Sequence, residues 1–159
     1  MKKIMGVVVS LCFAVLLNAQ TKVTKTNVVG KWTISAMEMP GIFSYSVETD
    51  SLFIGEAIKA QMTDPKQLEL VKGQFRAQMG VMSKMLFQFN ADGTALLVDG
   101  MREPQPATYS VDEEKSTITT IEKEGSEKET LNAEFVDGKL KLKLNSPNGE
   151  VVLMMKKAG

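Results

Sequence analysis

Apolar and polar residues alternate along most of the chain after residue 84. Residues 139–144 show the pattern without a break, with lysines at the odd positions and leucines at the even ones. A period of two places one face of a β-strand in a core and the other face in solvent. By the same criterion we predict strands over residues 28–36, 42–47, 85–90, 94–98, 108–111, 117–123, 130–136, 139–144 and 151–156.

Short turn signals separate these segments. Asp92-Gly93 and Asp137-Gly138 are typical of tight hairpins, because glycine tolerates the positive φ that such turns need. Hairpins of this kind join antiparallel neighbours. A sheet of about eight strands would leave two unpaired edges if it stayed open, and closure into a barrel removes them. We therefore predict a mostly β fold, an antiparallel up-and-down barrel of about eight strands. A β-sandwich fits the same alternation and stays the alternative.

Residues 51–84 follow a different pattern and predict a helical insert. Asp64-Pro65 is a helix start signal, with Asp as N-cap and Pro at the first helical position. Residues 52–62 lack alternation and are compatible with helix. One apolar helix face then follows at spacings of three and four, and it consists of Leu68, Val71, Phe75, Met79 and Met82. Gly80 favours an end to this helix near Met79.

The first 19 residues have the pattern of a secretory signal peptide. Lys2 and Lys3 precede an apolar run that is shorter than a membrane span, and a small residue, Ala19, follows at the cut site. A membrane anchor or an internal core helix is the alternative. A lipoprotein signal would need a small residue directly before Cys12, but Leu11 occupies that position. We therefore predict no lipid anchor. We predict cleavage after about Ala19, export to the periplasm or the exterior, a flexible lead over residues 20–27 and one domain over residues 28–157.

The composition of the predicted mature chain excludes several classes of partner. Removal of Lys2 and Lys3 leaves 17 basic against 19 acidic residues, a net charge of −2, and nucleic-acid binding would require a basic face. No second apolar run is long enough to span a bilayer. No cysteine remains, so the fold rests on its hydrophobic core without disulfides. No feature of the sequence fixes an oligomeric state.

The composition also excludes several chemistries. The chain has no histidine, and its single cysteine lies in the predicted signal peptide, which removes Ser-His-Asp and Cys-His nucleophiles and His- or Cys-ligated metals. No nucleotide-binding or nucleophile-elbow motif occurs. We therefore predict no enzyme, no cofactor and no metal, with a carboxylate-only enzyme as the remaining catalytic alternative. Acidic residues gather at positions 112–114, in a turn, and at 122–129, where they alternate with lysines and predict an exposed, charged hairpin end.

Three short motifs resemble the lipocalin family. Gly30-Lys31-Trp32 opens the first strand, as the Gly-x-Trp motif does in lipocalins. Residues 87–94 (FQFNADGT) and 108–112 (TYSVD) are similar to bacterial lipocalin-like domains of small exported proteins. The resemblance covers residues 28–157. It implies an up-and-down barrel in which Trp32 closes one end.

The same resemblance implies a basic residue of the last strand against Trp32. Lys156 or Lys157 stands at that position, whereas the family usually has an arginine, and no arginine follows Arg102 here. A lysine cannot stack as a planar guanidinium does. The insert is a second departure, because the long lipocalin helix follows the barrel strands. We expect the insert either to cap the open end or to lie along the outside.

These observations favour a non-catalytic exported protein that binds a small apolar or amphipathic ligand. An eight-stranded barrel is wide enough to be filled by side chains or to hold one small ligand. The alternative is a solid-barrel interaction or structural module of the cell envelope, for which the outward apolar residues Leu86, Leu96, Val98, Val152 and Met154 would supply a surface. For each residue that we predict to contact the ligand, packing in the hydrophobic core is the alternative role. The predicted lining, which includes the adaptable methionines, is Phe75, Met79, Met82, Phe87, Phe89 and Tyr109.

Overall fold

The computed structural model describes residues 21–62, 64–99, 103–122, 128–147 and 149–159. The predicted signal peptide, residues 1–19, and its cleavage point lie outside these residues. Of the helices in the described segments, none combines the length and hydrophobicity needed to cross a bilayer.

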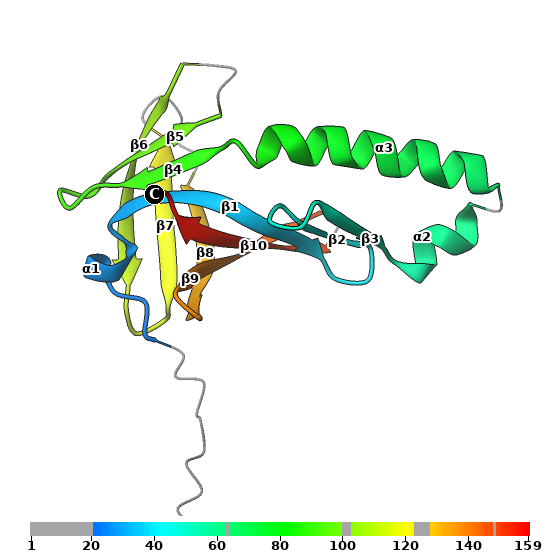
Figure 1. Ribbon diagram of the computed structural model, residues 1–159. Helices are drawn as coiled ribbons and strands as arrows, with labels where there is room; N and C mark the ends of the chain where they lie inside the picture. Colours follow the sequence, from blue (N-terminus) through cyan, green and yellow to red (C-terminus); the bar gives the residue numbers. More distant parts are fainter. Residues whose placement is uncertain (1–20, 63, 100–102, 123–127, 148) are drawn as a thin grey trace, which may run out of the picture.

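Eight strands form a closed antiparallel barrel (Figure 1). Each strand pairs with the next one in this series, and β10 pairs back with β1. This closure confirms the predicted barrel and rules out the β-sandwich, because a sandwich would leave two sheets with open borders. The barrel strands are β1 (Gly30–Met39), β4 (Leu86–Phe89), β5 (Thr94–Val98), β6 (Gln105–Asp112), β7 (Thr117–Glu122), β8 (Lys128–Val136), β9 (Lys139–Ser146) and β10 (Gly149–Lys157).

The insert between β1 and β4 is a hairpin followed by two helices. It consists of β2 (Phe43–Ser46), β3 (Ser51–Ile54), α2 (Glu56–Gln61) and α3 (Pro65–Met82). The predicted helix over residues 52–62 is therefore wrong in its first part, which is strand β3. The start of α3 is confirmed, since the Asp64 side chain accepts a hydrogen bond from the Lys66 amide at 2.9 Å. The helix continues to Met82, three residues beyond the predicted end.

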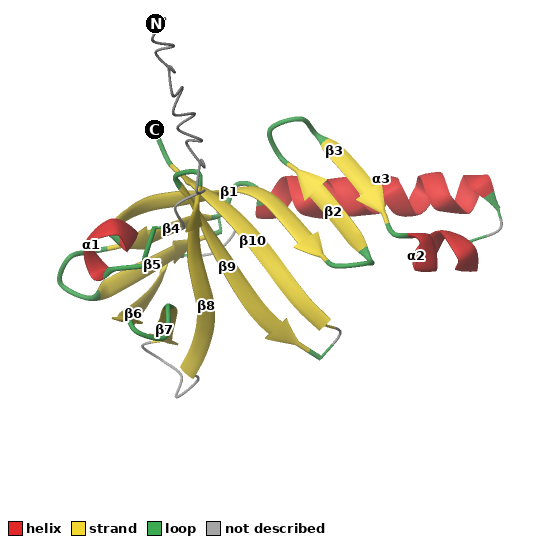
Figure 2. Ribbon diagram, turned by 90° about the horizontal axis from the view of Figure 1, so that it is seen from below, coloured by secondary structure: helices red, strands yellow, loops and turns green. Residues whose placement is uncertain are grey.

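Helix α3 packs along its own hairpin and does not cap the barrel (Figure 2). The rings of Phe75 on α3 and Phe43 on β2 lie 5.2 Å apart. Gly55 ends β3 where the chain passes Gly41, and a Cβ at this position would overlap the Gly41 carbonyl oxygen. A helix with one apolar stripe needs an apolar partner, and the hairpin supplies it locally. The insert thus projects beside the barrel, and only the C-terminal end of α3 reaches the barrel rim (Figure 1).

Strand β1 contains a bulge that changes which residues face the core. Trp32 and Ile34 point inward, as predicted, but the pairing with β10 shifts between Ile34 and Ala36. Ser35 is buried at this bulge, where its hydroxyl donates to the Met154 carbonyl at 3.0 Å. The extra residue reverses the alternation. Met37 is therefore buried, whereas an unbroken period of two from Trp32 and Ile34 would wrongly place Ala36 in the core.

The segment predicted as a flexible lead is packed against the barrel from Thr21 onward. Helix α1 (Lys25–Val28) begins with a capping box in which Thr24 and Asn27 exchange hydrogen bonds. Val23 and Val28 are fully buried on either side of this turn. The Thr-x-x-Asn spacing carried the missed signal, because a capping box starts a helix even where the sequence looks polar.

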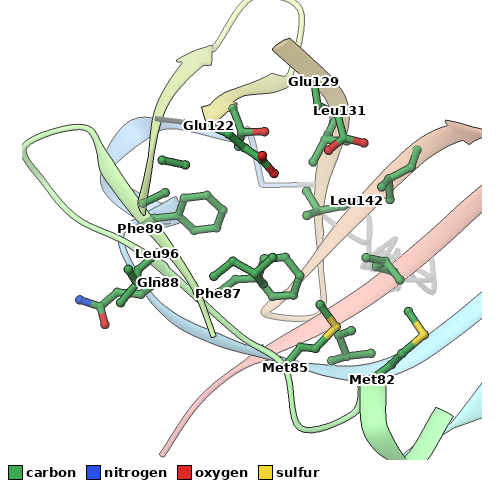
Figure 3. Close-up of a pocket in the computed structure, with 17 residues that line it drawn as sticks. Met82, Met85, Phe87, Gln88, Phe89, Leu96, Glu122, Glu129, Leu131 and Leu142 are labelled. Atoms are coloured by element: carbon green, nitrogen blue, oxygen red, sulfur yellow. The ribbon is translucent and has the colours of Figure 1, made fainter. Parts of the chain in front are cut away.

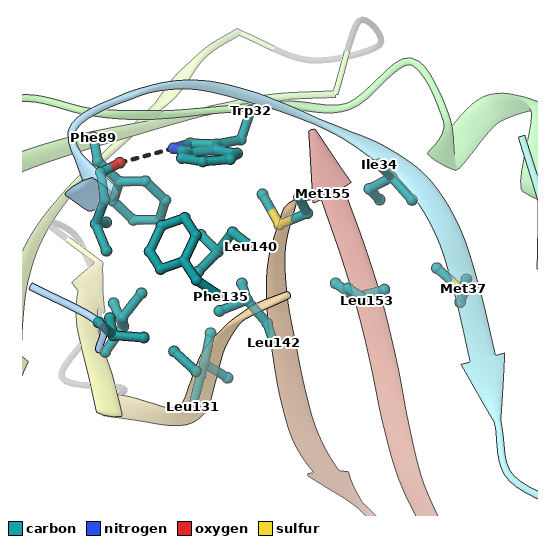
Figure 4. Packing of buried hydrophobic residues seen from close by; sticks show 14 of the residues in the cluster. Trp32, Ile34, Met37, Phe89, Leu131, Phe135, Leu140, Leu142, Leu153 and Met155 are labelled. Carbon is teal, nitrogen blue, oxygen red and sulfur yellow. Dashed lines mark hydrogen bonds between the residues drawn. The ribbon is translucent and has the colours of Figure 1, made fainter. Parts of the chain in front are cut away.

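Trp32 lies at one end of the packed interior (Figure 4), and Val28 of α1 is buried against it, so that together they close this end of the barrel. The Trp32 indole is fully buried, donates to the Val28 carbonyl at 2.7 Å, and lies 5.8 Å from the Phe135 ring. The Lys157 ammonium sits 5.4 Å from the Trp32 ring, within the range of a cation–π contact. Gly30 enters the strand at a φ of 140°, which favours glycine. Both glycine and tryptophan of the Gly-x-Trp motif therefore have a structural role at the closed end.

Candidate ligand-binding site

The half of the barrel away from Trp32 is hollow (Figure 3). Its cavity has a volume of about 300 Å³, at the lower end of the range for small-molecule pockets. The lining comes from all eight barrel strands and from the end of α3. It comprises Ile34, Met82, Met85, Phe87, Gln88, Phe89, Ala95, Leu96, Leu97, Ala107, Thr120, Glu122, Glu129, Leu131, Leu142, Leu144 and Leu153.

Most of the cavity wall is apolar because each strand contributes its inward register. Phe87 and Phe89 come from β4, and Leu97 pairs with Phe87 across the β4–β5 ladder. Gln88 lies between the two phenylalanines, and its side chain points away from the cavity in Figure 3. Its amide donates to Asn90 at 2.8 Å instead. The wall therefore favours the apolar part of a ligand by excluding it from water.

Two glutamates face the cavity from β7 and β8 (Figure 3). On β7 the inward register runs from the buried Ile118 through Thr120 to Glu122. On β8 it runs from the buried Leu131 to Glu129, which pairs with Thr120. Both carboxylates belong to residues that water reaches. They form a polar, acidic border on an otherwise apolar cavity.

These glutamates were missed at the sequence level. The sequence predicted residues 122–129 as an exposed hairpin end. Glu122 and Glu129 are exposed, but the prediction overlooked that both face the cavity. The signal was the strand alternation itself, continued two residues beyond the last apolar inward position. The mixed Glu/Lys composition obscured this alternation, because the same composition is typical of a solvated turn.

The charge at this border is not neutralised within the described residues. No ion pair there joins Glu122 or Glu129 to a lysine or arginine. Of the described residues that line the cavity, none is basic. Within the described residues, the two carboxylates therefore place uncompensated negative charge at the mouth of an apolar cavity.

Three of the six predicted lining residues border the cavity. Met82, Phe87 and Phe89 do so, at the end of α3 and along β4. Met85, next to Met82 in the rim, was not among the predicted residues. Its inward register before Phe87 carried the signal. Ligand contact by these side chains stays a prediction.

The other three predicted residues lie elsewhere. Phe75 packs on Phe43, and Met79 is buried in the same helix–hairpin layer. Their spacing on α3 is the spacing of a core stripe, but no local pattern indicates that the hairpin supplies the partner of that stripe. Tyr109 packs edge-on against Phe89 at 4.9 Å and donates its hydroxyl to the Asn90 carbonyl at 2.8 Å. Burial raises the pKa of this phenol above its ordinary value.

The apolar residues that the sequence predicted to face outward do not form an exposed patch. Val152 is buried, and Leu86, Leu96, Val98 and Met154 are partly buried. The large apolar side chains that are most exposed in the described chain belong to the insert, namely Phe53 at 56% and Leu70 at 64%. Ile121 on β7 of the barrel is less exposed, at 43%, so the insert has the strongest apolar candidates for contact with a protein partner.

In the described segments no cluster of three or more histidine, cysteine, aspartate or glutamate residues is arranged to hold a metal ion. The arrangement that remains is an apolar cavity with an acidic mouth. Comparison of the chain with protein-family models, with curated proteins and with solved structures found no match in any of the three.

Proposed function

We propose that this chain is an exported, non-catalytic binding protein that holds a small apolar or amphipathic molecule in the open half of its barrel. The cavity of about 300 Å³ is the observation that carries the proposal. A solid barrel would have had no room for a guest. An apolar wall with a few polar groups at one side is the usual composition of a small-molecule site.

The volume also limits the size of the ligand. A water molecule occupies about 30 Å³ in the liquid, so the cavity has room for on the order of ten non-hydrogen atoms. This suits a short acyl or alkyl chain or a small ring system. A larger guest would extend through the mouth past Glu122 and Glu129.

The lipocalin resemblance supports the same proposal. The closed eight-stranded barrel, Trp32 at its closed end and Lys157 against the indole agree with what that resemblance implies. Export rests on the signal-peptide pattern of residues 1–19 alone. We propose the periplasm or the exterior as the place of action.

Native mass spectrometry of the protein purified from its own source would test the proposal. We expect a retained small molecule that is lost on unfolding. Ala107→Phe should abolish this retention, because Ala107 lines the cavity and a phenyl ring would fill it. Ala77→Phe, the same change at an exposed position of α3, should retain the molecule. Absence of any bound molecule, together with no uptake of added apolar compounds, would contradict the proposal.

The exposed apolar residues of the insert favour a second candidate, a protein-interaction module of the cell envelope. Phe53 and Leu70 are on β3 and α3, away from the barrel. Under this alternative, Leu70→Lys would abolish a complex detected by cross-linking and leave ligand retention unchanged. Under the binding function alone, the variant would change neither.

A further inference from the structure

The cavity has two chemically different borders, and they restrict the class of ligand beyond a general apolar preference. Met82, Met85 and Phe87 come from the side of α3 and β4. Glu122 and Glu129 come from β7 and β8, on the far side of the barrel from β4 (Figure 3). A molecule that fills the cavity therefore meets an apolar wall along its length and carboxylates at the mouth.

Resting on the proposed function, we infer that the site selects amphipathic cations, molecules with a short apolar body and a protonated amine or similar cationic head. The apolar body occupies the space beside Phe87, Phe89 and Leu142. The head stays at the mouth, where the Glu122 and Glu129 carboxylates accept its hydrogen bonds. Thr120, which pairs with Glu129 and lies two residues before Glu122 on β7, offers a hydroxyl to the same head group.

The charges around the cavity favour this class over the alternatives. A fatty-acid carboxylate would enter beside two like charges, and no basic residue of the described lining would compensate them. A neutral alcohol would gain the apolar burial without the charge-assisted hydrogen bonds. Lys128 precedes Glu129 on β8, but alternation directs it to the opposite face of the strand.

The head group need not be dehydrated for this selection to operate. Both glutamates are solvent-exposed, so their interaction with a cation resembles a surface ion pair. Such pairs contribute little individually and weaken with salt. The apolar cavity therefore supplies most of the affinity, and the carboxylates supply the discrimination.

Matched eight-carbon probes test the inference in calorimetric titrations at neutral pH. Octylamine, octanol and octanoate share one chain and differ in the head group, and octylamine is protonated at this pH. We expect octylamine to bind roughly three- to tenfold more tightly than octanol, and octanoate to bind more weakly than octanol. The preference for the amine should shrink as the salt concentration rises, whereas octanol binding should not weaken.

Variants then assign the preference to the two glutamates. In the double variant Glu122→Gln/Glu129→Gln we expect octylamine and octanol to bind equally, with octanol affinity unchanged. The matched control, Glu38→Gln/Glu114→Gln, removes the same charge at exposed positions that do not line the cavity and should keep the preference. Far-ultraviolet circular dichroism confirms that each variant is folded.

The outcomes separate this inference from the function on which it rests. Equal binding of octylamine and octanol to the unmodified protein, or a preference for octanoate, would overturn the cationic class and leave the binding function standing. A preference for the amine that persists in Glu122→Gln/Glu129→Gln would also overturn it. Failure of all three probes to bind would overturn the binding function and the inference together.

Discussion

The two halves of this barrel are built by the same strands and the same alternation, yet one is solid and the other is hollow. At the closed end Trp32, Phe135, Leu140 and Met155 fill the interior, and each is buried (Figure 4). At the open end several inward positions carry small side chains, such as Ala95, Ala107 and Thr120, and leave a cavity. The difference comes from side-chain volume and from the plug that α1 supplies at one end only.

This contrast divides stability and function between the halves. A close-packed interior forms many dispersion contacts, so truncation there leaves a void that neighbours cannot fill. Side chains around a cavity lack dispersion contacts on the side that faces the cavity. Substitutions there should therefore change the cavity volume more than the free energy of unfolding. Three comparisons test this division, and a fourth prediction concerns pH; they follow in order of decreasing effect.

Truncation should be most costly at the closed end. Trp32→Ala removes the largest fully buried side chain and its hydrogen bond to Val28. We expect a loss of about 3–5 kcal/mol in the free energy of unfolding. Phe87→Ala, at the half-buried cavity wall, should cost less than half as much. Urea titrations followed by circular dichroism measure both, and equal losses would contradict a division between the two ends.

Adding volume should show the same contrast, with the packed half again losing more stability than the hollow half. Ala133 is 1% exposed in the packed half, and Ala133→Phe should destabilise by about 1–3 kcal/mol through overpacking. Ala107→Phe enters the cavity and should leave the free energy of unfolding nearly unchanged. Thermal unfolding of the two variants provides the measurement. A large loss in Ala107→Phe would mean that the open half has no usable space.

Helix α1, which covers the closed end, should contribute a smaller amount to the free energy of unfolding. Thr24→Ala removes the side-chain oxygen that accepts a hydrogen bond from the Asn27 amide at 3.3 Å, which is one half of the capping box. We expect a loss of about 1 kcal/mol, typical of an N-cap. Hydrogen exchange should increase at α1 and at the Trp32 indole, with no change along β7 and β8. An unchanged indole exchange rate would show that α1 does not hold the closed end.

The smallest expected effect is the pH dependence of stability that comes from the two tyrosines. Burial raises the pKa of Tyr109, and the hydrogen bond to Asp50 raises that of Tyr45. A raised phenol pKa means that the folded state favours the neutral form, so this stabilisation is present below about pH 10 and is lost as the pH rises through the folded pKa. Phenolate absorbance should appear above pH 10 for both tyrosines. In Tyr109→Phe one of the two absorbance steps should vanish. In the unmodified protein, titration of Tyr109 at the ordinary pKa of tyrosine would contradict its burial.

Much of the architecture was predictable because it is local. The lysine–leucine alternation of residues 139–144 identified β9 and its buried face, with Leu140 and Leu142 fully buried. Asp64-Pro65 gave the start of α3. The two tight turns at Asp92-Gly93 and Asp137-Gly138 adopt the backbone that glycine permits. In each case the residues that carry the signal are neighbours in the chain.

The errors share a long-range cause. The bulge in β1 depends on pairing with β10, more than a hundred residues away, and it exchanged the faces of Ala36 and Met37. The apolar face of α3 had to pack on something, but only the fold shows that Phe43 of β2 is the partner of Phe75. The candidate site was therefore half predictable. Phe87 and Phe89 followed from register, whereas Glu122 and Glu129 required knowledge of which strand positions surround the void.

The sequence by itself determined the strand periodicity, the turns, the antiparallel order and the absence of histidine chemistry, because each depends on composition or on spacing within a short segment. Only the tertiary structure decided that one half of the barrel stays empty and that two carboxylates border it. Empty volume is a property of side chains from many strands at once. No single segment of the chain contains that information.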